Sequence, residues 1–411
     1  MFSATPSRLL VGLSLVLGMD DVVRGAQARA PNTVLVRDAG ELRQAVRQAK
    51  PGVRILLAAG EYPGGFYFPN LRGEPDKPIV IAAADPAHPP VIRGWPEGLN
   101  LAHVAYVQVE QLVVTGSQHN GLNISDGGSF DTPAHHVVLR GLRVTDVGQE
   151  GNEDGIKLSG VDDFRVEGCT IERWGTGGGS AIDMVGCHRG VIAGNTVRHH
   201  ATTAEQPCNG VQAKGGCAQI TVRKNRFEHA GHIAMNLGGS TNPQVFRPPL
   251  KTRPGPHYEA QDVLVEGNVF IGSGTPAAFV GVDGGVVRFN TIYGPRHWAL
   301  RILHGENVAP SFVPSRSGRF TDNIVAFRSD QWWDGGVNIS SHTAPKTFVF
   351  ARNFWYCLDN PQKSRPTLPT PEANGIYGSS PQFRNATTGD LRLQPASPAW
   401  RVGAEALPRE R

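Results

Sequence analysis

The sequence predicts an all-β fold: a single-domain, right-handed parallel β-helix, which is a solenoid of short strands, with a capping helix at its N-terminal end. Three observations support this fold. A cycle of two apolar/polar alternations joined by a Gly turn recurs along the chain, and residues 209–225 form its clearest copy. No helix of ordinary length separates the strands. Gly and Asn end the strands in place of hairpin dipeptides, and the blade signature of a propeller is absent.

The N-terminal end is expected to hold the capping helix. Asp38 has the side chain of a helix cap and follows a strand at residues 34–37. One apolar face follows at helical spacing: Leu42, Ala45, Val46 and Ala49. Pro51 then ends the pattern. A helix here would cover the open end of the coil, where backbone groups otherwise lack partners.

The chain has 411 residues, and a repeat array of this length is one continuous body. We therefore expect one domain, present as a monomer. Its parts are a signal peptide at 1–28, a cap with the first rungs at 29–100, rungs with loop insertions at 101–360, and a closing segment at 361–411.

The first residues are typical of an export signal. Residues 9–18 are apolar, too short to span a bilayer but suited to a signal-peptide core, and Ala26 and Ala28 offer a cleavage site. Asp20 and Asp21 interrupt this pattern, so an unstructured leader is the alternative. No other stretch has the length of a membrane span. The sequence therefore predicts a secreted or periplasmic protein.

The charge of the chain bears on whether it binds nucleic acid, and its cysteine content bears on whether it contains a disulfide. The net charge is +4 and is spread along the chain, and the signatures of nucleic-acid binding are missing, so we expect no nucleic-acid partner. Of the five cysteines, Cys208 and Cys217 bracket one strand. They could pair in an oxidising compartment, and buried free thiols stacked in the coil are an equal alternative.

Asparagines recur near the end of the second strand of each cycle. They are Asn195, Asn225, Asn268, Asn290, Asn323 and Asn353. In a coil they would stack at a turn and hydrogen-bond between rungs. We therefore assign them a structural role.

Three insertions interrupt the rhythm, at residues 117–133, 240–259 and 305–318. Long loops of a repeat protein usually line one binding face. The second loop is basic and aromatic, and its Arg247, His257 and Tyr258 are candidate substrate-binding residues for an acidic sugar chain. A solvated loop is the alternative.

Aligning the first strand of each cycle on its inward apolar pair predicts which side chains point outward, because neighbours on a strand alternate faces. The first outward row is Asn123, Lys157, Asp183, Gln212, Asn236, Gly281 and Arg301. The second row is Ser125, Ser159, Val185, Lys214, Gly238, Asp283 and Leu303, with His304 beside it.

This polar stripe has the chemistry to bind an extended polysaccharide. Lys157, Asp183, Gln212 and Asn236 are candidate substrate-binding residues. The alternative for Lys157 and Asp183 is an ion pair between neighbouring rungs. Lys214 has no acidic residue aligned beside it, so its alternative is an ordinary exposed lysine.

Several segments resemble exported β-helix polysaccharide lyases, above all polysaccharide lyase family six, which contains alginate lyases and chondroitinase B. Residues 41–65 with 78–83 are similar to the cap and first rungs of such enzymes, and residues 380–383 with 389–398 are similar to their closing segment. Residues 209–215, 225–227 and 234–239 resemble the catalytic rungs of family six, with Lys214 at the place of its lysine base.

The resemblance implies elimination from a uronate polysaccharide. This reaction needs a neutralised carboxylate, a base for the C5 proton and an acid for the leaving oxygen. Lys214 is the candidate base. Two positions depart from the family: Gly238 stands where it has an arginine, and the glutamate that helps to bind calcium is replaced around Asn209. Arg301 or His304 could substitute for the arginine, although both lie two cycles further on.

A calcium ion could neutralise the carboxylate. Oxygen ligands of the preferred kind occur at Glu153, Asp154 and Asp183. The spacing matches no calcium-loop motif, so a solvated acidic turn is the alternative.

The leading hypothesis is an exported lyase acting on an acidic polysaccharide. A non-catalytic carbohydrate-binding solenoid is the second, supported by the missing arginine. A β-helix glycoside hydrolase would need two carboxylates about 5.5 or about 6.5–9.5 Å apart. Asp183 and Asp283, the acids in the rows, are three cycles apart.

Overall fold

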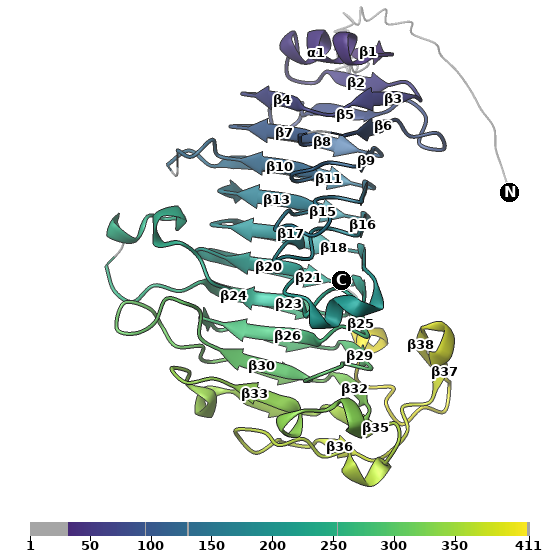
Figure 1. Cartoon of the computed structure of the whole chain (residues 1–411), viewed down its shortest axis with the longest axis vertical. Helices are drawn as coiled ribbons and strands as arrows, with labels where there is room; N and C mark the ends of the chain where they lie inside the picture. The colour runs from purple at the N-terminus through teal and green to yellow at the C-terminus, as the bar shows by residue number, and fades with distance from the viewer. Residues whose placement is uncertain (1–31, 95, 130, 253, 409–411) are drawn as a thin grey trace, which may run out of the picture. The chain divides into compact units, whose positions relative to one another are not determined.

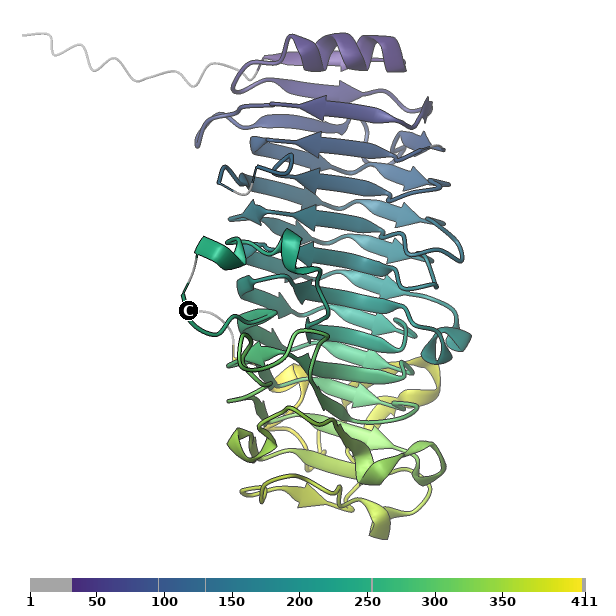
Figure 2. The same ribbon diagram turned by 60° about the vertical axis from the view of Figure 1, so that its left-hand side comes forward.

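A computed structural model describes residues 32–408 except 95, 130 and 253, and these residues form a parallel β-helix. The predicted signal peptide at 1–28 lies outside the described residues. Each turn of the coil contributes one strand to each of three parallel sheets, which we call sheets A, B and C (Figure 1). Figure 2 shows the rungs stacked one above another, with the loop at 240–259 projecting from one face. The prediction of fold class is confirmed.

Sheet A contains the strand that follows sheet C in each turn. Its strands are β1 (Thr33–Val36), β2 (Arg54–Leu57), β5 (Ile79–Ala83), β8 (Ala105–Glu110), β11 (Ala134–Arg140), β14 (Val161–Asp162), β15 (Arg165–Glu167), β18 (His188–Ala193), β21 (Cys217–Arg223), β24 (Ala260–Glu266), β27 (Val282–Asp283), β28 (Val286–Arg288), β31 (Arg319–Thr321) and β34 (Val349–Ala351).

Sheet B follows sheet A in each turn. Its strands are β3 (Glu61–Pro63), β6 (Val91–Arg93), β9 (Val113–Thr115), β12 (Arg143–Thr145), β16 (Thr170–Glu172), β19 (Thr196–Arg198), β22 (Arg226–Glu228), β25 (Val269–Ile271), β29 (Thr291–Tyr293), β32 (Ile324–Phe327), β35 (Phe354–Cys357) and β36 (Ile376–Tyr377).

Sheet C carries the predicted polar stripe. Its strands are β4 (Phe66–Pro69), β7 (Leu99–Ala102), β10 (Leu122–Ser125), β13 (Ile156–Ser159), β17 (Ser180–Val185), β20 (Asn209–Lys214), β23 (Ile233–Gly238), β26 (Thr275–Val280), β30 (Leu300–Leu303) and β33 (Val337–Ile339).

The two ends of the coil are built differently. Helix α1 (Ala39–Arg47) lies at the N-terminal end, where the Asp38 side chain accepts a hydrogen bond from the backbone N–H of Glu41, and Leu42 and Val46 are buried as predicted. The antiparallel pair β37 (Phe383–Asn385) and β38 (Asp390–Leu393) belongs to the closing segment, which runs back beside sheet B (Figure 1). Arg226 of β22 donates to the Gly389 carbonyl there, 3.1 Å away.

Short 3₁₀ helices lie in the loops. They are η1 (Ala201–Glu205), η2 (Pro243–Val245), η3 (Leu250–Thr252), η4 (Ser329–Gln331), η5 (Asp334–Gly336), η6 (Pro345–Thr347), η7 (Pro361–Lys363), η8 (Ala386–Thr388) and η9 (Ala404–Ala406). No helix in the described ranges is long and apolar enough to cross a membrane.

The inside of the coil is apolar and is closed at one turn by the predicted asparagine ladder. Each amide donates from Nδ2 to the Oδ1 of the next asparagine: the Asn195–Asn225 and Asn225–Asn268 distances are both 2.9 Å, and the series continues to Asn353. Because all six side chains are buried, their hydrogen bonds replace those that water would make. The structural role predicted for these residues is confirmed.

The five cysteines are buried free thiols, which decides between the two alternatives for Cys208 and Cys217. Cys217 instead stacks on Cys187 of the preceding rung, whose backbone N–H donates to its sulfur over 3.2 Å. The insertions at 240–259 and 305–318 are loops as expected. The insertion predicted at 117–133 is wrong as a single loop, because β10 crosses it and pairs in register with β7 and β13.

Candidate functional site

The outward row of sheet C places the predicted polar side chains next to one another. Asn123 pairs with Lys157, Lys157 with Asp183, Asp183 with Gln212, and Gln212 with Asn236. Neighbouring strands lie about 4.8 Å apart, so these side chains form one continuous line on the surface of the coil.

The row was predicted wrongly at the next strand. Ala277 and Phe279 fill the interior there, so Ala278, and not Gly281, stands between Asn236 and Arg301. Asp283 lies in β27 of sheet A, where Arg316 binds it at 2.7 Å. Alanine is a weak marker of an inward face, which is why the apolar pattern favoured Val280 and Val282 instead.

A cluster of four charges lies at the centre of the row. The Lys157 ammonium contacts Asp183 closely and lies 3.1 Å from Asp154 Oδ2. Lys214, one strand beyond Asp183, lies 3.5 Å from the same Asp183 oxygen. The prediction that Lys214 has no acidic neighbour is therefore wrong, because its long side chain reaches diagonally across to the preceding rung. The ion pair offered as the alternative for Lys157 and Asp183 is present.

Both carboxylates of the cluster are buried. Asp183 is 2% exposed, and its Oδ1 is buried without a hydrogen-bond partner in the described part of the chain. Although burial opposes it, the charges of Lys157 and Lys214 lower the pKa of Asp183. Burial, and then the charge of Asp183, raise the pKa of Asp154 to about 7. The pKa values of the two acids are thus shifted in opposite directions. Lys157, held between them, has a raised pKa although burial opposes it.

The shifted pKa of Asp154 predicts a pH-dependent stability. Its folded pKa of about 7 lies above the ordinary 3.8, so between these values the folded protein holds a proton that the unfolded chain has released. The free energy of unfolding should therefore fall as pH rises through this window, by up to ~1.4 kcal/mol per pH unit from this group. Urea unfolding at several pH values should show a smaller fall in Asp154→Asn. An equal fall in both proteins would contradict the assignment.

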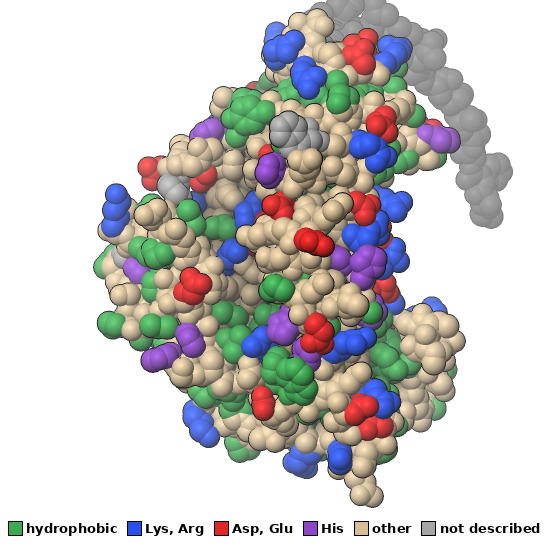
Figure 3. Space-filling view, viewed as in Figure 1, with side chains coloured by type: hydrophobic (Ala, Val, Ile, Leu, Met, Phe, Trp, Pro, Cys, Tyr) green, Lys and Arg blue, Asp and Glu red, His purple; other side chains and the backbone are tan. Residues whose placement is uncertain are grey.

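A pocket of about 410 Å³ opens over this cluster, within the ~300–1,000 Å³ typical of ligand sites. Sheet C supplies its floor, and the loop at 240–259 supplies a wall. Its lining is Ser125, Asp126, Gly128, Lys157, Ser159, Gly160, Val185, Lys214, Ser240, Thr241, Asn242, Val245 and Arg247. Figure 3 shows this face hollowed beside the projecting loop, with Lys or Arg side chains inside the hollow.

Most of the pocket wall could not be recognised from the sequence. Ser240, Thr241 and Asn242 were recognised only as loop residues, and Asp126 lies in what was predicted as a loop. Ser125 and Ser159 line the pocket and stand in the second outward row, so this row was the part of the sequence pattern that indicated the pocket.

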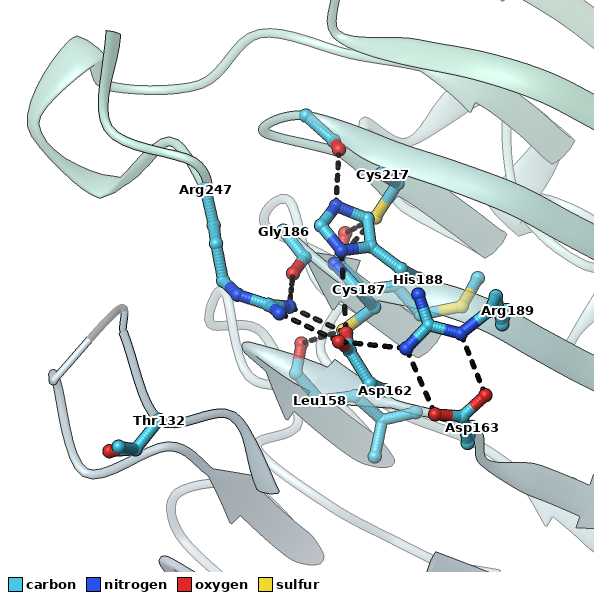
Figure 4. A network of polar contacts seen from close by, with 12 residues as sticks. Thr132, Leu158, Asp162, Asp163, Gly186, Cys187, His188, Arg189, Cys217 and Arg247 are labelled. Carbon is cyan, nitrogen blue, oxygen red and sulfur yellow. Dashed lines mark hydrogen bonds and ion pairs between the residues drawn. The ribbon is translucent and has the colours of Figure 1, made fainter. Parts of the chain in front are cut away.

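Arg247 fixes the loop at 240–259 to the coil (Figure 4). Its guanidinium donates to both oxygens of Asp162, over 2.6 and 2.8 Å, and to the Gly186 carbonyl over 2.8 Å. Arg189 binds the same carboxylate at 3.1 Å, and His188 lies 3.4 Å from it. Because Arg247 is 8% exposed and its charge is paired, it supports the pocket wall, whereas the sequence indicated a substrate contact.

The other candidates of this loop lie away from Lys214. His257 and Tyr258 line a separate small cavity with Phe246 and Pro248. The His257 ring packs 5.5 Å from Phe312. These two residues therefore do not join the four-charge cluster.

Gln212 and Asn236 continue the row beside Lys214. Gln212 Oε1 accepts from Asn209 over 3.1 Å and from Asn236 over 3.3 Å, and Asn236 Oδ1 is buried without a partner in the described ranges. Both side chains are less than 8% exposed. They pack beneath the pocket edge and orient one another.

Gly238 cannot be replaced by the arginine of the resembling family. Its φ of +98° favours glycine, and an added Cβ would collide with the carbonyl oxygen of Val280. The strand register shifts here, because Ala213 pairs with Gly238 and Leu237 has no partner on β20. The backbone at Gly238 therefore suits glycine and does not suit a residue with a side chain, such as arginine.

We expect Gly238→Ala to be less stable than Gly194→Ala by about 2 kcal/mol, as for an overpacked core site. Gly194 also has a positive φ, of +65°, but open space around its Cβ position, so the comparison isolates the collision with Val280. Chemical denaturation of both variants measures the difference. Equal losses of stability would show that the backbone at Gly238 can move aside.

Arg301 and His304 lie outside the cluster. Arg301 is on β30, three strands beyond β20, or about 14 Å at 4.8 Å per strand. It contacts His232 and Asn338. His304 Nδ1 lies 2.9 Å from Ser340 Oγ. Arg301 is therefore too far along the sheet to act on a bond held at Lys214.

The residues predicted to bind calcium do not fit that ion. Asp154 and Asp183 converge on the Lys157 ammonium, which occupies the position between them that a cation would take. Asp154 Oδ1 also accepts from the backbone N–H of Ser180 at 2.7 Å. Within the described ranges, no group of three His, Cys, Asp or Glu side chains is arranged to hold a metal ion.

Comparisons with known proteins agree with the fold. A family model described as a right-handed β-helix region matches residues 97–248, and no curated protein matches the sequence. Pectate lyase Pel9A is 13% identical with a TM-score of 0.51, and the match covers 87% of this chain and 84% of that one.

Two alginate lyases are also similar in structure. One, from Paenibacillus sp., is 19% identical with a TM-score of 0.49, over 76% of this chain and 99% of that one. The other, the family six enzyme AlyGC, is 13% identical with a TM-score of 0.48, over 92% of this chain and 57% of that one. A lacto-N-biosidase, which is a glycoside hydrolase, is found too. Because a fold does not determine a reaction, the function has to be argued from the residues.

Proposed function

We propose that this chain cleaves a uronate-containing polysaccharide by β-elimination in the pocket on sheet C, with Lys214 as the base. The observation that supports this most is the unequal pairing of the two lysines. Lys157 is held by Asp154 and Asp183, whereas Lys214 has a single, longer contact of 3.5 Å to Asp183. One lysine is therefore a fixed cation, and the other is free to move toward a ligand.

The two lysines would divide the work of the reaction. Lys157, whose pKa is raised, remains protonated and places a positive charge at the pocket floor, where it would stabilise charge developing on the uronate carboxylate. Lys157 also balances the negative charge of Asp183, and Asp154 is partly neutral near its pKa of about 7. Both effects reduce the net negative charge beside Lys214.

The proton and the bonds of the proposed step can be accounted for with Lys214 alone. Neutral Lys214 takes the C5 proton, the C4–O bond breaks, and a C4–C5 double bond forms. The leaving oxygen needs a proton, and the Lys214 ammonium can return it when both atoms lie on the same face of the sugar. This assignment needs no second acid, which suits a site from which Arg301 lies three strands away.

One observation favours a non-catalytic carbohydrate-binding protein instead. Lys214 forms an ion pair with Asp183, and this geometry also suits a lysine that binds an acidic sugar without taking a proton from it. The pocket would then recognise an acidic polysaccharide without cleaving it. Export of the chain, proposed from its first residues, suits either role.

Ultraviolet absorbance of the unsaturated product tests the proposal on alginate, pectate, chondroitin sulfate and dermatan sulfate. We expect a rise with one of these polymers. Because Lys157 fills the cation position, we expect a metal chelator to leave the rate unchanged. Binding without any rise would favour the carbohydrate-binding protein, and loss of activity on chelation would show that an essential metal binds elsewhere.

A further inference from the structure

We propose that Arg301, Trp298 and Trp333 form a second carbohydrate subsite, which binds a carboxylate-bearing sugar unit remote from Lys214. The inference rests on the proposed acidic polysaccharide substrate. Arg301 stands in the same outward row as Asp183 and Gln212, so a chain bound along sheet C could contact both regions.

The charge of Arg301 has no acidic partner in the described part of the chain. Its Nε donates to Asn338 Oδ1 over 3.0 Å, and its Nη1 lies 3.0 Å from His232 Nε2. Burial lowers the pKa of Arg301, because the guanidinium has lost water without gaining a carboxylate. Arginines elsewhere on the coil, such as Arg316 and Arg352, bind aspartates at 2.7 and 2.6 Å. A desolvated guanidinium without a carboxylate is suited to bind one from a ligand.

His232 holds this guanidinium without neutralising it. Its Nδ1 lies 2.8 Å from the Ala204 carbonyl, which can only accept, so Nδ1 carries the proton and Nε2 accepts from Arg301. Burial and the charge of Arg301 lower the pKa of His232, which keeps the ring neutral. Among the described residues the hydrogen bonds of Arg301 use Nε and Nη1, which leaves Nη2 for a ligand.

Two tryptophans lie beside Arg301: Trp298, which is 7% exposed and supports the guanidinium, and Trp333, which is exposed. The Arg301 guanidinium lies 4.6 Å from the centre of the Trp298 ring. Trp333 packs edge-on against Trp298, with ring centres 5.1 Å apart, and against His297 at 4.2 Å, yet it remains 49% exposed. An ordered, exposed indole beside a free cation is suited to stack on the apolar face of a sugar ring while the cation binds its carboxylate.

Affinity electrophoresis in gels containing alginate, pectate or chondroitin sulfate tests this subsite. The Lys214→Ala background keeps the polymer intact. Removing one charge-assisted contact should weaken binding of the retained polymer about tenfold in Arg301→Gln, and Trp333→Ala should weaken it several-fold. Binding of the carboxyl-reduced form of the same polymer should be insensitive to Arg301→Gln.

Matched controls are Arg316→Gln, whose charge is paired with Asp283, and Trp400→Ala, whose ring is 62% exposed on the closing segment. Affinities of Arg301→Gln and Trp333→Ala equal to those of these controls would overturn the subsite, as would failure of every polymer to bind. The lyase proposal and the subsite can be distinguished. If wild-type protein forms no unsaturated product but Arg301→Gln still weakens binding, the lyase proposal is wrong and the subsite is supported.

Discussion

Lys214→Ala is expected to lower kcat by about 10²–10⁴-fold, the range for loss of a general base. Lys214 has one longer ion-pair contact, whereas Lys157 is held between two aspartates, so we do not expect Lys157 to replace Lys214 as the base. Folding should be unaffected, because Asp183 retains its closer partner Lys157. The rate of formation of unsaturated product measures the loss.

Two variants separate charge from basicity. Lys214→Arg keeps the positive charge but replaces the amine by a guanidinium that does not release its proton, so we expect binding to be retained and kcat to be lost. Lys224→Ala removes an exposed lysine at a turn outside the pocket and should be fully active. Activity of Lys214→Arg near that of the wild type would contradict the base assignment and leave Lys214 a binding cation.

Asp162→Asn is expected to lower the free energy of unfolding by roughly 3 kcal/mol, at the lower end of the cost of breaking a buried ion pair. The change leaves the Arg247 guanidinium, 8% exposed, without its carboxylate. Arg247 carries the loop that forms the pocket wall, so activity should fall at temperatures where the coil is still folded. Limited proteolysis within 240–259 and urea unfolding measure the two effects.

Asp163→Asn is the matched control for Asp162→Asn. Asp163 is the next residue and also binds Arg189, at 2.7 Å, but its side chain is 33% exposed and touches no part of the loop. Solvent screens such a pair, so we expect a loss below about 1 kcal/mol and an unchanged pattern of proteolysis. If the two variants behave alike, Arg247 does not anchor the loop.

The coil itself could be predicted from sequence, because its rules are local and repeat. Alternation of inward and outward residues follows from strand geometry, and this alternation is sufficient to place Lys157, Asp183 and Gln212 in one row. The Asn ladder follows from position at a turn in the same way.

The contacts that build the site could not be predicted. They depend on how far a side chain extends and on which segments, distant in the sequence, the fold brings together. Alignment by rungs does not show that Lys214 extends across to Asp183. Arg247 and Asp162 are 85 residues apart, so their ion pair cannot be recognised from the sequence. The sequence therefore indicated a substrate contact for Arg247, whereas in the structure this residue anchors the loop. Likewise, the sequence does not show that the Lys157 ammonium lies between Asp154 and Asp183, two of the proposed calcium ligands.

Cleavage by elimination is tested most directly by the mass spectrum of the oligosaccharides that are released from the polymer in water enriched in heavy oxygen. Elimination moves a proton and breaks the C4–O bond without adding water. We therefore expect unsaturated fragments into which cleavage introduces no heavy oxygen and whose release requires Lys214. Saturated fragments that carry the label would show hydrolysis and contradict it, and so would the absence of fragments from every polymer tested.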